Sequence, residues 1–158
     1  MKDRKQERLE LIRLLAIHTD APARPISTQA EDFSQAKTAK RHANVAKVFA
    51  PVLDRVLEEG EYVFIDTTLL DTGKQGYLFT EDSFARSEAS MDWTIAPERR
   101  LREPVYLDEL NHVSAVESDL VFHFEDGHEE QAFFGIFTAY FQLLFTGILE
   151  AFRNQENV

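Results

Sequence analysis

The chain has 158 residues, of which 44% are hydrophobic and 13 are phenylalanine, and it contains no cysteine. This length and composition suit one domain with an aromatic-rich core, with or without a helical extension. The absence of cysteine excludes a disulfide framework, thiolate chemistry and cysteine-based metal sites. It also suits a reducing compartment, so we expect a cytoplasmic protein.

The net charge of −11 is unevenly distributed. Residues 1–60 carry 11 Lys and Arg against 9 Asp and Glu, whereas residues 61–158 carry 6 against 19. The acidic second part would repel nucleic acid and anionic lipid head groups. The contrast predicts a helical N-terminal extension at 1–59 and a separate domain at 60–158, unless the acidity only keeps the protein soluble.

Helical periodicity dominates the first part. Residues 2–18 place apolar side chains at helical spacing and charges on the other face, which predicts a helix. This mixed-charge start lacks the uninterrupted apolar run of a signal peptide. Pro22 and Pro25 predict an extended linker at 19–28.

Two further helices are expected before residue 60. One is capped by Ser27 or Thr28 and runs to about His42. The other spans about 44–58, where Pro51 predicts a kink or break. We expect Gly60 to end it. Its inward-facing residues would be Val45, Val48, Phe49, Val52, Leu53, Val56 and Leu57.

From Glu61 the apolar period changes from helical to two, which indicates strands. In the first of them, Tyr62, Phe64 and Asp66 should face one way and Val63 and Ile65 the other. A loop is expected at 89–102. The predicted strands are 61–66, 76–80, 83–88, 105–107, 112–116, 120–125 and 131–134.

Asp126-Gly127 is the strongest hairpin signal, because a two-residue turn of this kind needs positive φ. If these two residues are the loop, Glu125 faces His128 and His123 faces Glu130. The carboxylates and imidazoles around the turn could hold a divalent cation. We prefer solvated cross-strand pairs. The side chains concerned are His123, Glu125, Asp126, His128, Glu129 and Glu130.

The segment 136–153 is the most apolar of the chain. Its length could suit a membrane span, but flanking basic residues are nearly absent and polar residues interrupt it. We therefore expect a helix buried on most of its circumference, with a curved sheet on one side and the N-terminal helices or a second subunit on the other. Its apolar breadth suggests a homodimer. Its polar stripe comprises Thr138, Gln142, Thr146, Glu150 and Arg153.

A set of residues from about 60 to 153 has the pattern of a known family: Glu61, Phe64, Asp66-Thr67-Thr68, Gly73-Lys74-Gln75-Gly76, Thr80 and the run 105–110. With these residues the segment resembles bacterial pleckstrin-homology-like (PH-like) domains of unassigned function. The resemblance implies an α+β fold, in which a small antiparallel barrel or sheet of about seven strands is capped by a long C-terminal helix. It implies no enzymatic activity. Eukaryotic relatives bind phosphoinositides through basic residues of the first hairpin, where this chain offers only Lys74.

Asp71-Thr72-Gly73 has the form of an aspartic protease motif. Such an enzyme needs two carboxylates that share a proton, and the cation of Lys74 would oppose that sharing. Gly73 and Gly76 supply the backbone freedom of a turn, which is the interpretation we prefer. The full phosphate-loop pattern is absent, and no helix is expected after Gly73-Lys74.

Two basic patches are too small to bind nucleic acid beside so acidic a domain. We expect the first to dock on the acidic domain of this chain or of a partner, or to be simply solvated. His18 and His42 are expected at the surface. The patches are Lys37, Lys40, Arg41 and Lys47, and then Arg99, Arg100 and Arg102.

These features together predict a non-catalytic interaction protein without catalytic residues, cofactor or metal. Its acidic PH-like domain would bind a basic or amphipathic protein segment in a hydrophobic groove or at an open sheet edge. The alternatives are a bacterial immunity protein or secretion chaperone that neutralises a basic partner, a peripheral lipid binder, and an enzyme of unrecognised type. All of them stay open on the sequence alone.

Overall fold

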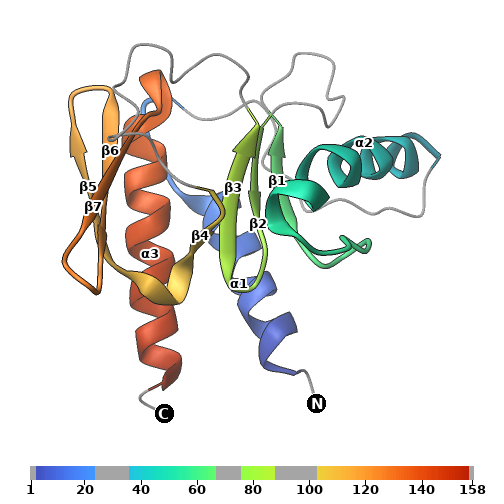
Figure 1. Ribbon diagram of the computed structural model, residues 1–158, viewed down its shortest axis with the longest axis horizontal. Coiled ribbons are helices and arrows are strands. Elements are labelled where there is room, and N and C mark those ends of the chain that lie inside the picture. Colours follow the sequence, from blue (N-terminus) through green and yellow to red (C-terminus); the bar gives the residue numbers. More distant parts are fainter. Residues whose placement is uncertain (1–2, 24–35, 67–75, 88–102, 157–158) are drawn as a thin grey trace.

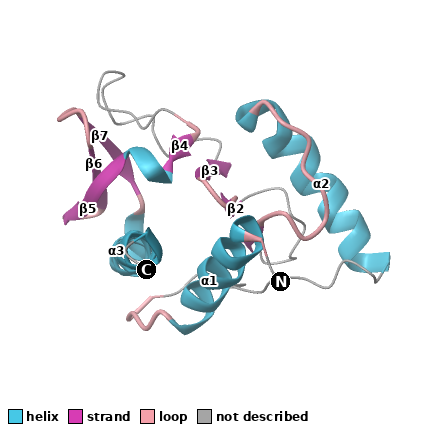
Figure 2. Ribbon diagram, turned by 90° about the horizontal axis from the view of Figure 1, so that it is seen from below, coloured by secondary structure: helices cyan, strands magenta, loops and turns pink. Residues whose placement is uncertain are grey.

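The computed structural model describes residues 3–23, 36–66, 76–87 and 103–156. Helix α3 lies between two antiparallel sheets, and α2 covers the opposite face of the first sheet (Figure 1, Figure 2). The described elements are α1 Arg4–His18, α2 Ala36–Leu53, β1 Val63–Asp66, β2 Gly76–Phe79, β3 Ser83–Ser87, β4 Val105–Tyr106, η2 Leu107–Glu109, β5 Leu110–Val116, β6 Asp119–Phe124, β7 Glu129–Phe133, η3 Gly135–Phe137 and α3 Thr138–Glu156.

The strands pair in the orders β1-β2-β3-β4 and β5-β6-β7, and every pair is antiparallel. The expected α+β class is confirmed. A closed barrel is not formed by the described strands, because β4 and β5 belong to different sheets. The short 3-10 helix η2 turns the chain between them, and α3 occupies the space between the two sheets.

Helix α1 confirms the first expected helix. Asp3 caps its N-terminus, where the carboxylate Oδ1 accepts a hydrogen bond from the backbone N–H of Gln6 at 2.8 Å. Leu9, Ile12 and Ala16 form its buried apolar face. A helix with this spacing must pack against another apolar surface, which α3 provides.

The expected break between two helices near residue 43 is wrong, because a single helix, α2, continues from Ala36 to Leu53. The stretch 36–50 contains neither Gly nor Pro, so nothing in it interrupts helical hydrogen bonding. Pro51 lies in the last turn, and the helix ends two residues later. The proposed cap at Ser27 or Thr28 lies outside the described residues.

The apolar face of α2 is narrower than expected. Val45, Phe49, Leu53 and Leu57 are buried, and Val48 is partly buried. The inward positions predicted for Val52 and Val56 are wrong, since these side chains are 37% and 75% exposed. Gly60 ends no helix, because α2 stops at Leu53 and residues 59–60 form a turn.

Strand β1 is buried on both faces, and the predicted alternation of its side chains is confirmed. Val63 and Ile65 join the main core cluster with α3. Tyr62 and Phe64 join a second cluster with the apolar face of α2. The first sheet is therefore a partition between two apolar layers, which explains why its strands contain few polar residues.

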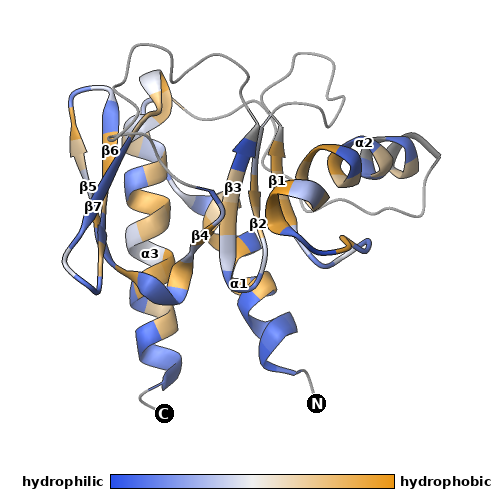
Figure 3. Ribbon diagram, viewed as in Figure 1, coloured by the Kyte–Doolittle hydropathy of each residue, from blue (hydrophilic) through white to orange (hydrophobic). Residues whose placement is uncertain are grey.

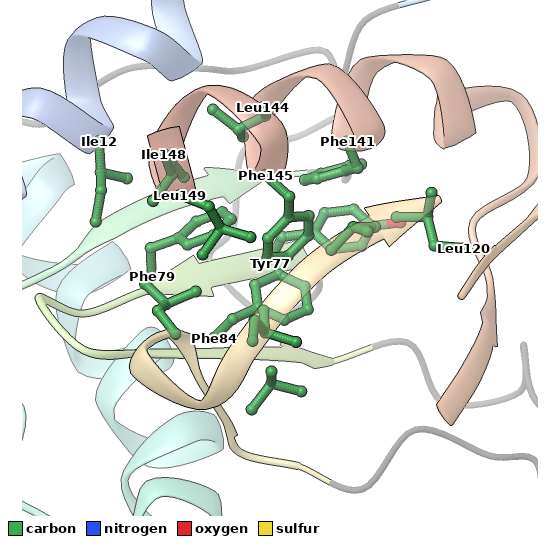
Figure 4. Packing of buried hydrophobic residues seen from close by; sticks show 14 of the residues in the cluster. Ile12, Tyr77, Phe79, Phe84, Leu120, Phe141, Leu144, Phe145, Ile148 and Leu149 are labelled. Carbon is green, nitrogen blue, oxygen red and sulfur yellow. The ribbon is translucent and has the colours of Figure 1, made fainter. Parts of the chain in front are cut away.

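Aromatic side chains fill the main core. The ring of Tyr77 on β2 lies 4.3 Å from that of Phe141 on α3, and Phe145 packs against both Phe84 and Phe122 at 5.0 and 5.2 Å. Figure 4 shows the rings of Tyr77, Phe84, Phe141 and Phe145 converging from the first sheet and the helix. Aromatic contacts of this kind add to the stability that apolar burial provides.

The hairpin between β6 and β7 has a three-residue loop, so the expected pairing is wrong by one residue. The N–H of Gly127 donates to the Phe124 carbonyl at 3.0 Å, and the register places His123 opposite Glu129. Gly127 has φ +94°, as expected, whereas Asp126 does not have positive φ. A three-residue loop needs the left-handed conformation only at its last residue.

Gly76 at the start of β2 is expected to tolerate no side chain. Its φ is +154°, and a Cβ would lie 2.2 Å from the Ile65 carbonyl oxygen. Gly76→Ala should lower the free energy of unfolding by roughly 2–3 kcal/mol, measured by urea denaturation. Gly147→Ala on α3 is the control, because its φ is not in the left-handed region and a Cβ there would lie at an ordinary 3.5 Å from Leu15. Equal stability of the two variants would contradict the β1–β2 register.

Candidate functional site

The exposed edge of β5 and the C-terminal half of α3 enclose a groove of about 290 Å³. Val113 and Leu149, each 5% exposed, form its apolar floor. Thr146 and Glu150 on α3 are exposed along one wall. The lining residues are Asn111, His112, Val113, Thr146, Leu149, Glu150, Arg153 and Asn154.

A β-bulge shapes the β5 side of the groove. The register shifts between Leu110 and His112, which leaves Asn111 without a partner residue on β6. The Asn111 carbonyl accepts a hydrogen bond from the guanidinium of Arg153. Bulges occur at sheet edges, where they redirect backbone groups. Here the bulge turns a backbone acceptor toward α3.

A smaller cavity of about 90 Å³ continues the groove toward the C-terminus. The two share Leu149 and Arg153, and the smaller one adds the carboxylates of Asp108, Glu125 and Glu156. With Glu150, four carboxylates and one guanidinium line the combined surface. This surface therefore favours a positively charged ligand.

The polar stripe expected on the last helix supplies one wall of this groove. Thr146, Glu150 and Arg153 recur at about four-residue spacing on α3 and are exposed. Thr138 is the exception, because it is buried and its hydroxyl donates to the Gly135 carbonyl at 2.7 Å. Ile136, next to that turn, is 75% exposed. Leu143 is 51% exposed, and a homodimer of the expected kind would cover it together with Ile136.

The outer face of the β5-β6-β7 sheet carries a row of polar side chains that the sequence did not reveal. Ser114 Oγ lies 2.8 Å from His123 Nε2, and His123 Nδ1 lies 3.2 Å from Glu129 Oε1. The ring of His112 stacks on that of His123 at 4.0 Å. A nucleophile, a base and an orienting carboxylate in this order have the connectivity of a serine hydrolase triad.

The surroundings of this row do not complete an active site. A serine hydrolase also needs donors for the oxyanion and a site that excludes water. The Glu129 side chain is 60% exposed. Ser114 lines neither part of the groove, nor a third cavity of about 460 Å³ that is bounded by Arg4, Lys5, Arg8, Glu81, Asp82, Asp108 and Glu156.

The hairpin tip forms a separate cluster around His128. Its Nε2 lies 2.8 Å from Glu130 Oε2, and its Nδ1 contacts Asp126 Oδ1. The hydrogen bond with Glu130, and then that with Asp126, raises the pKa of His128. The predicted pairs of His123 with Glu130 and of His128 with Glu125 are wrong, because the loop contains three residues. Across the described ranges, no three His, Asp or Glu side chains are placed to hold a metal ion.

Other predicted sites receive less support. Lys40 and Lys47 are exposed on α2, which packs on this chain's own sheet through its apolar face. His18 is exposed, as expected, but His42 is not a plain surface residue, since its Nδ1 lies 2.7 Å from the Tyr62 hydroxyl. Outside the described residues, or without a described side chain, lie Lys37, Arg41, Asp71-Thr72-Gly73, Lys74, Arg99, Arg100 and Arg102.

Helix α3 with η3, at 135–156, is long and apolar enough to cross a membrane by length and composition alone. In the structure 44% of its most apolar 18-residue stretch is buried inside the protein, and Figure 3 marks the hydrophobic residues along the ribbon of the helix in orange. Its buried residues are Thr138, Tyr140, Phe141, Leu144, Phe145, Ile148, Leu149 and Phe152.

Comparison with known proteins returns no match for this chain, whether among protein-family models, curated proteins or solved structures. The functional assignment therefore depends on the geometry and chemistry of the groove and of the neighbouring charged residues.

The hairpin tip should be more stable at low pH. A raised folded-state pKa means that His128 stabilises the fold fully below its unfolded pKa of about 6.5, and that this contribution disappears as pH rises through the folded value. The stability difference between wild type and His128→Gln should be larger at about pH 5.5 than at about pH 8.5. Thermal denaturation at both values measures it, and an invariant difference would contradict the ion pairs.

Ser114 should not behave as an activated nucleophile, because Glu129 in the row is 60% exposed and Ser114 lines none of the three cavities described above. We expect a fluorophosphonate probe to label wild type no faster than Ser114→Ala, as followed by intact-protein mass spectrometry. Rapid labelling that Ser114→Ala and His123→Gln both abolish would show instead that the triad connectivity is catalytic.

Proposed function

We propose that this protein is a non-catalytic interaction module whose β5–α3 groove binds an extended, basic segment of a partner protein. The carrying observation is an open sheet edge beside an apolar floor with an acidic rim. Among the described strands β5 pairs only with β6, and its other edge is the one we assign to an added strand. Strand addition takes affinity from backbone hydrogen bonds and specificity from alternate side chains.

The chemistry of the groove defines the kind of segment. Apolar side chains of the partner would rest on Val113 and Leu149, and basic ones would reach Glu150 and Glu125. The net charge of −11 would accelerate the approach of such a partner. The same acidic rim disfavours anionic lipid head groups, so the proposal is a protein partner.

A PH-like arrangement of the residues from about 60 onward is part of this proposal. Strands ordered four plus three, followed by one long helix between the sheets, support it. The edge strand β5 of the second sheet lies next to the final helix, and the groove occurs between them. The fold alone does not specify the ligand, which is inferred from the groove lining.

The proposal is tested by titrating the protein with peptides of about nine residues in which basic and apolar side chains alternate. Peptides with acidic residues in place of the basic ones serve as the comparison. The basic peptides should shift the amide NMR signals of β5 and of the C-terminal half of α3. Thr146→Arg, which places a bulky cation in the groove, should weaken binding at least tenfold, or about 1.4 kcal/mol.

Ala139→Arg is the matched control, because it adds the same charge at an exposed position of α3 that does not line the groove. It should leave the affinity unchanged. Equal binding of acidic and basic peptides, or equal loss in the two variants, would refute the proposed site.

A further inference from the structure

Helix α1 covers one side of α3, and the two helices run antiparallel (Figure 1). At one end the Tyr140 hydroxyl donates to the Ala16 carbonyl at 2.6 Å. At the other end the guanidinium of Arg8 lies 4.0 Å above the ring of Phe152. Between them Gly147 leaves room for Leu15, which would lie 3.5 Å from a Cβ at that position.

Three basic residues of α1 pair with three carboxylates of the acidic second part of the chain. The pairs lie at the N-terminal end of α1, whose apolar residues Leu9, Ile12 and Ala16 belong to the main core cluster. They join Arg4 to Glu156 at 3.4 Å, Lys5 to Glu61 at 2.5 Å, and Arg8 to Asp108 at 3.1 and 3.2 Å. The contact between α1 and the remainder of the protein is thus strongly charge-complementary.

The presence of Arg8 distinguishes the contact between α1 and α3 from the rest of the core. Its side chain is only 7% exposed, yet its Nε has no hydrogen-bond partner among the residues that the structure describes. Burying an arginine beside a carboxylate stabilises a fold less than a well-packed apolar residue would. A buried arginine over an aromatic ring, with charged pairs beside it, is instead typical of interfaces between separate proteins.

We propose that the face of α3 beneath α1, rimmed by Glu61, Asp108 and Glu156, is a binding surface for a basic amphipathic helix of a partner protein, with α1 as its resident competitor. The partner helix would need a basic residue in the place of Arg8. Apolar residues would follow one, four and eight positions later, as Leu9, Ile12 and Ala16 do in α1. This surface shares Asp108 and Glu156 with the smaller cavity that continues the β5–α3 groove, but it does not rest on the function proposed for that groove.

While α1 is docked on this surface, a partner helix cannot bind there. The apparent affinity of the chain for the partner is therefore reduced in proportion to the fraction of molecules in which the surface is open. The probe is a fluorescein-labelled peptide with the sequence of residues 3–20, added to the full-length chain and followed by fluorescence anisotropy. Arg8→Glu in the chain weakens the docking of α1 but leaves the surface beneath it intact. This variant should bind the peptide at least tenfold more tightly than wild type does.

Arg13→Glu is the matched control, since Arg13 lies on α1 but pairs within the helix, with Glu10 at 2.5 Å. It should bind the peptide as weakly as wild type. A peptide that itself carries the Arg8→Glu change should bind neither chain. Equal binding by the Arg8→Glu and Arg13→Glu chains would overturn the proposal.

Two further outcomes are decisive. If Arg8→Glu unfolds the chain, added peptide should restore the circular dichroism spectrum of the folded protein, and failure to restore it would overturn the proposal. If the wild-type chain instead forms a dimer at high concentration that Arg8→Glu abolishes, the surface serves a second copy of this chain, and the assignment to a different partner is wrong.

Discussion

The structure depends on one constraint, the apolar circumference of α3. A helix satisfies its own backbone hydrogen bonds, so what this helix requires from the fold is apolar cover on several sides. Tyr77 and Phe84 in the first sheet cover one side, Phe122 in the second sheet covers another, and α1 closes a third. The two sheets stay separate because the helix occupies the space between them.

The groove lies along the remaining side of α3, which neither the two sheets nor α1 cover. Thr146, Glu150 and Arg153 face outward beside the edge of β5, so the same helix that organises the core also forms a wall of the candidate binding site. A site supported by the main core is held rigidly. Binding then needs little rearrangement of the backbone, which limits the entropy lost on association.

Buried guanidinium groups connect the parts of the fold. Arg86 on β3 donates to the Phe133 carbonyl at 2.5 Å and lies 5.1 Å from the ring of Phe134, which ties the first sheet to the end of the second. Arg8 ties α1 to α3 in a similar way. Both use one side chain to satisfy polar atoms and cover an aromatic ring, but only Arg8 retains a buried N–H without a partner in the described part of the chain.

Much of the architecture could be predicted from local sequence pattern. The alternation in β1, the position of α3 and the existence of most strands depend on side chains a few residues apart, where periodicity is informative. The wrong predictions concern positions where the local sequence pattern fits two different structures equally well. A hairpin loop of two or three residues at Asp126-Gly127 carries the same turn signal, and only the pairing of His123 with Glu129 distinguishes them.

The sequence by itself therefore determined the apolar helix, the strands and the acidic character of the second part. Tertiary structure alone decided which side chains meet. Arg8 and Asp108 are separated by 100 residues, and Ser114, His123 and Glu129 come from three different strands. Val113 and Leu149 likewise share the groove floor from β5 and α3. Periodicity reports which face of an element is buried, whereas contacts between elements depend on how the elements pack.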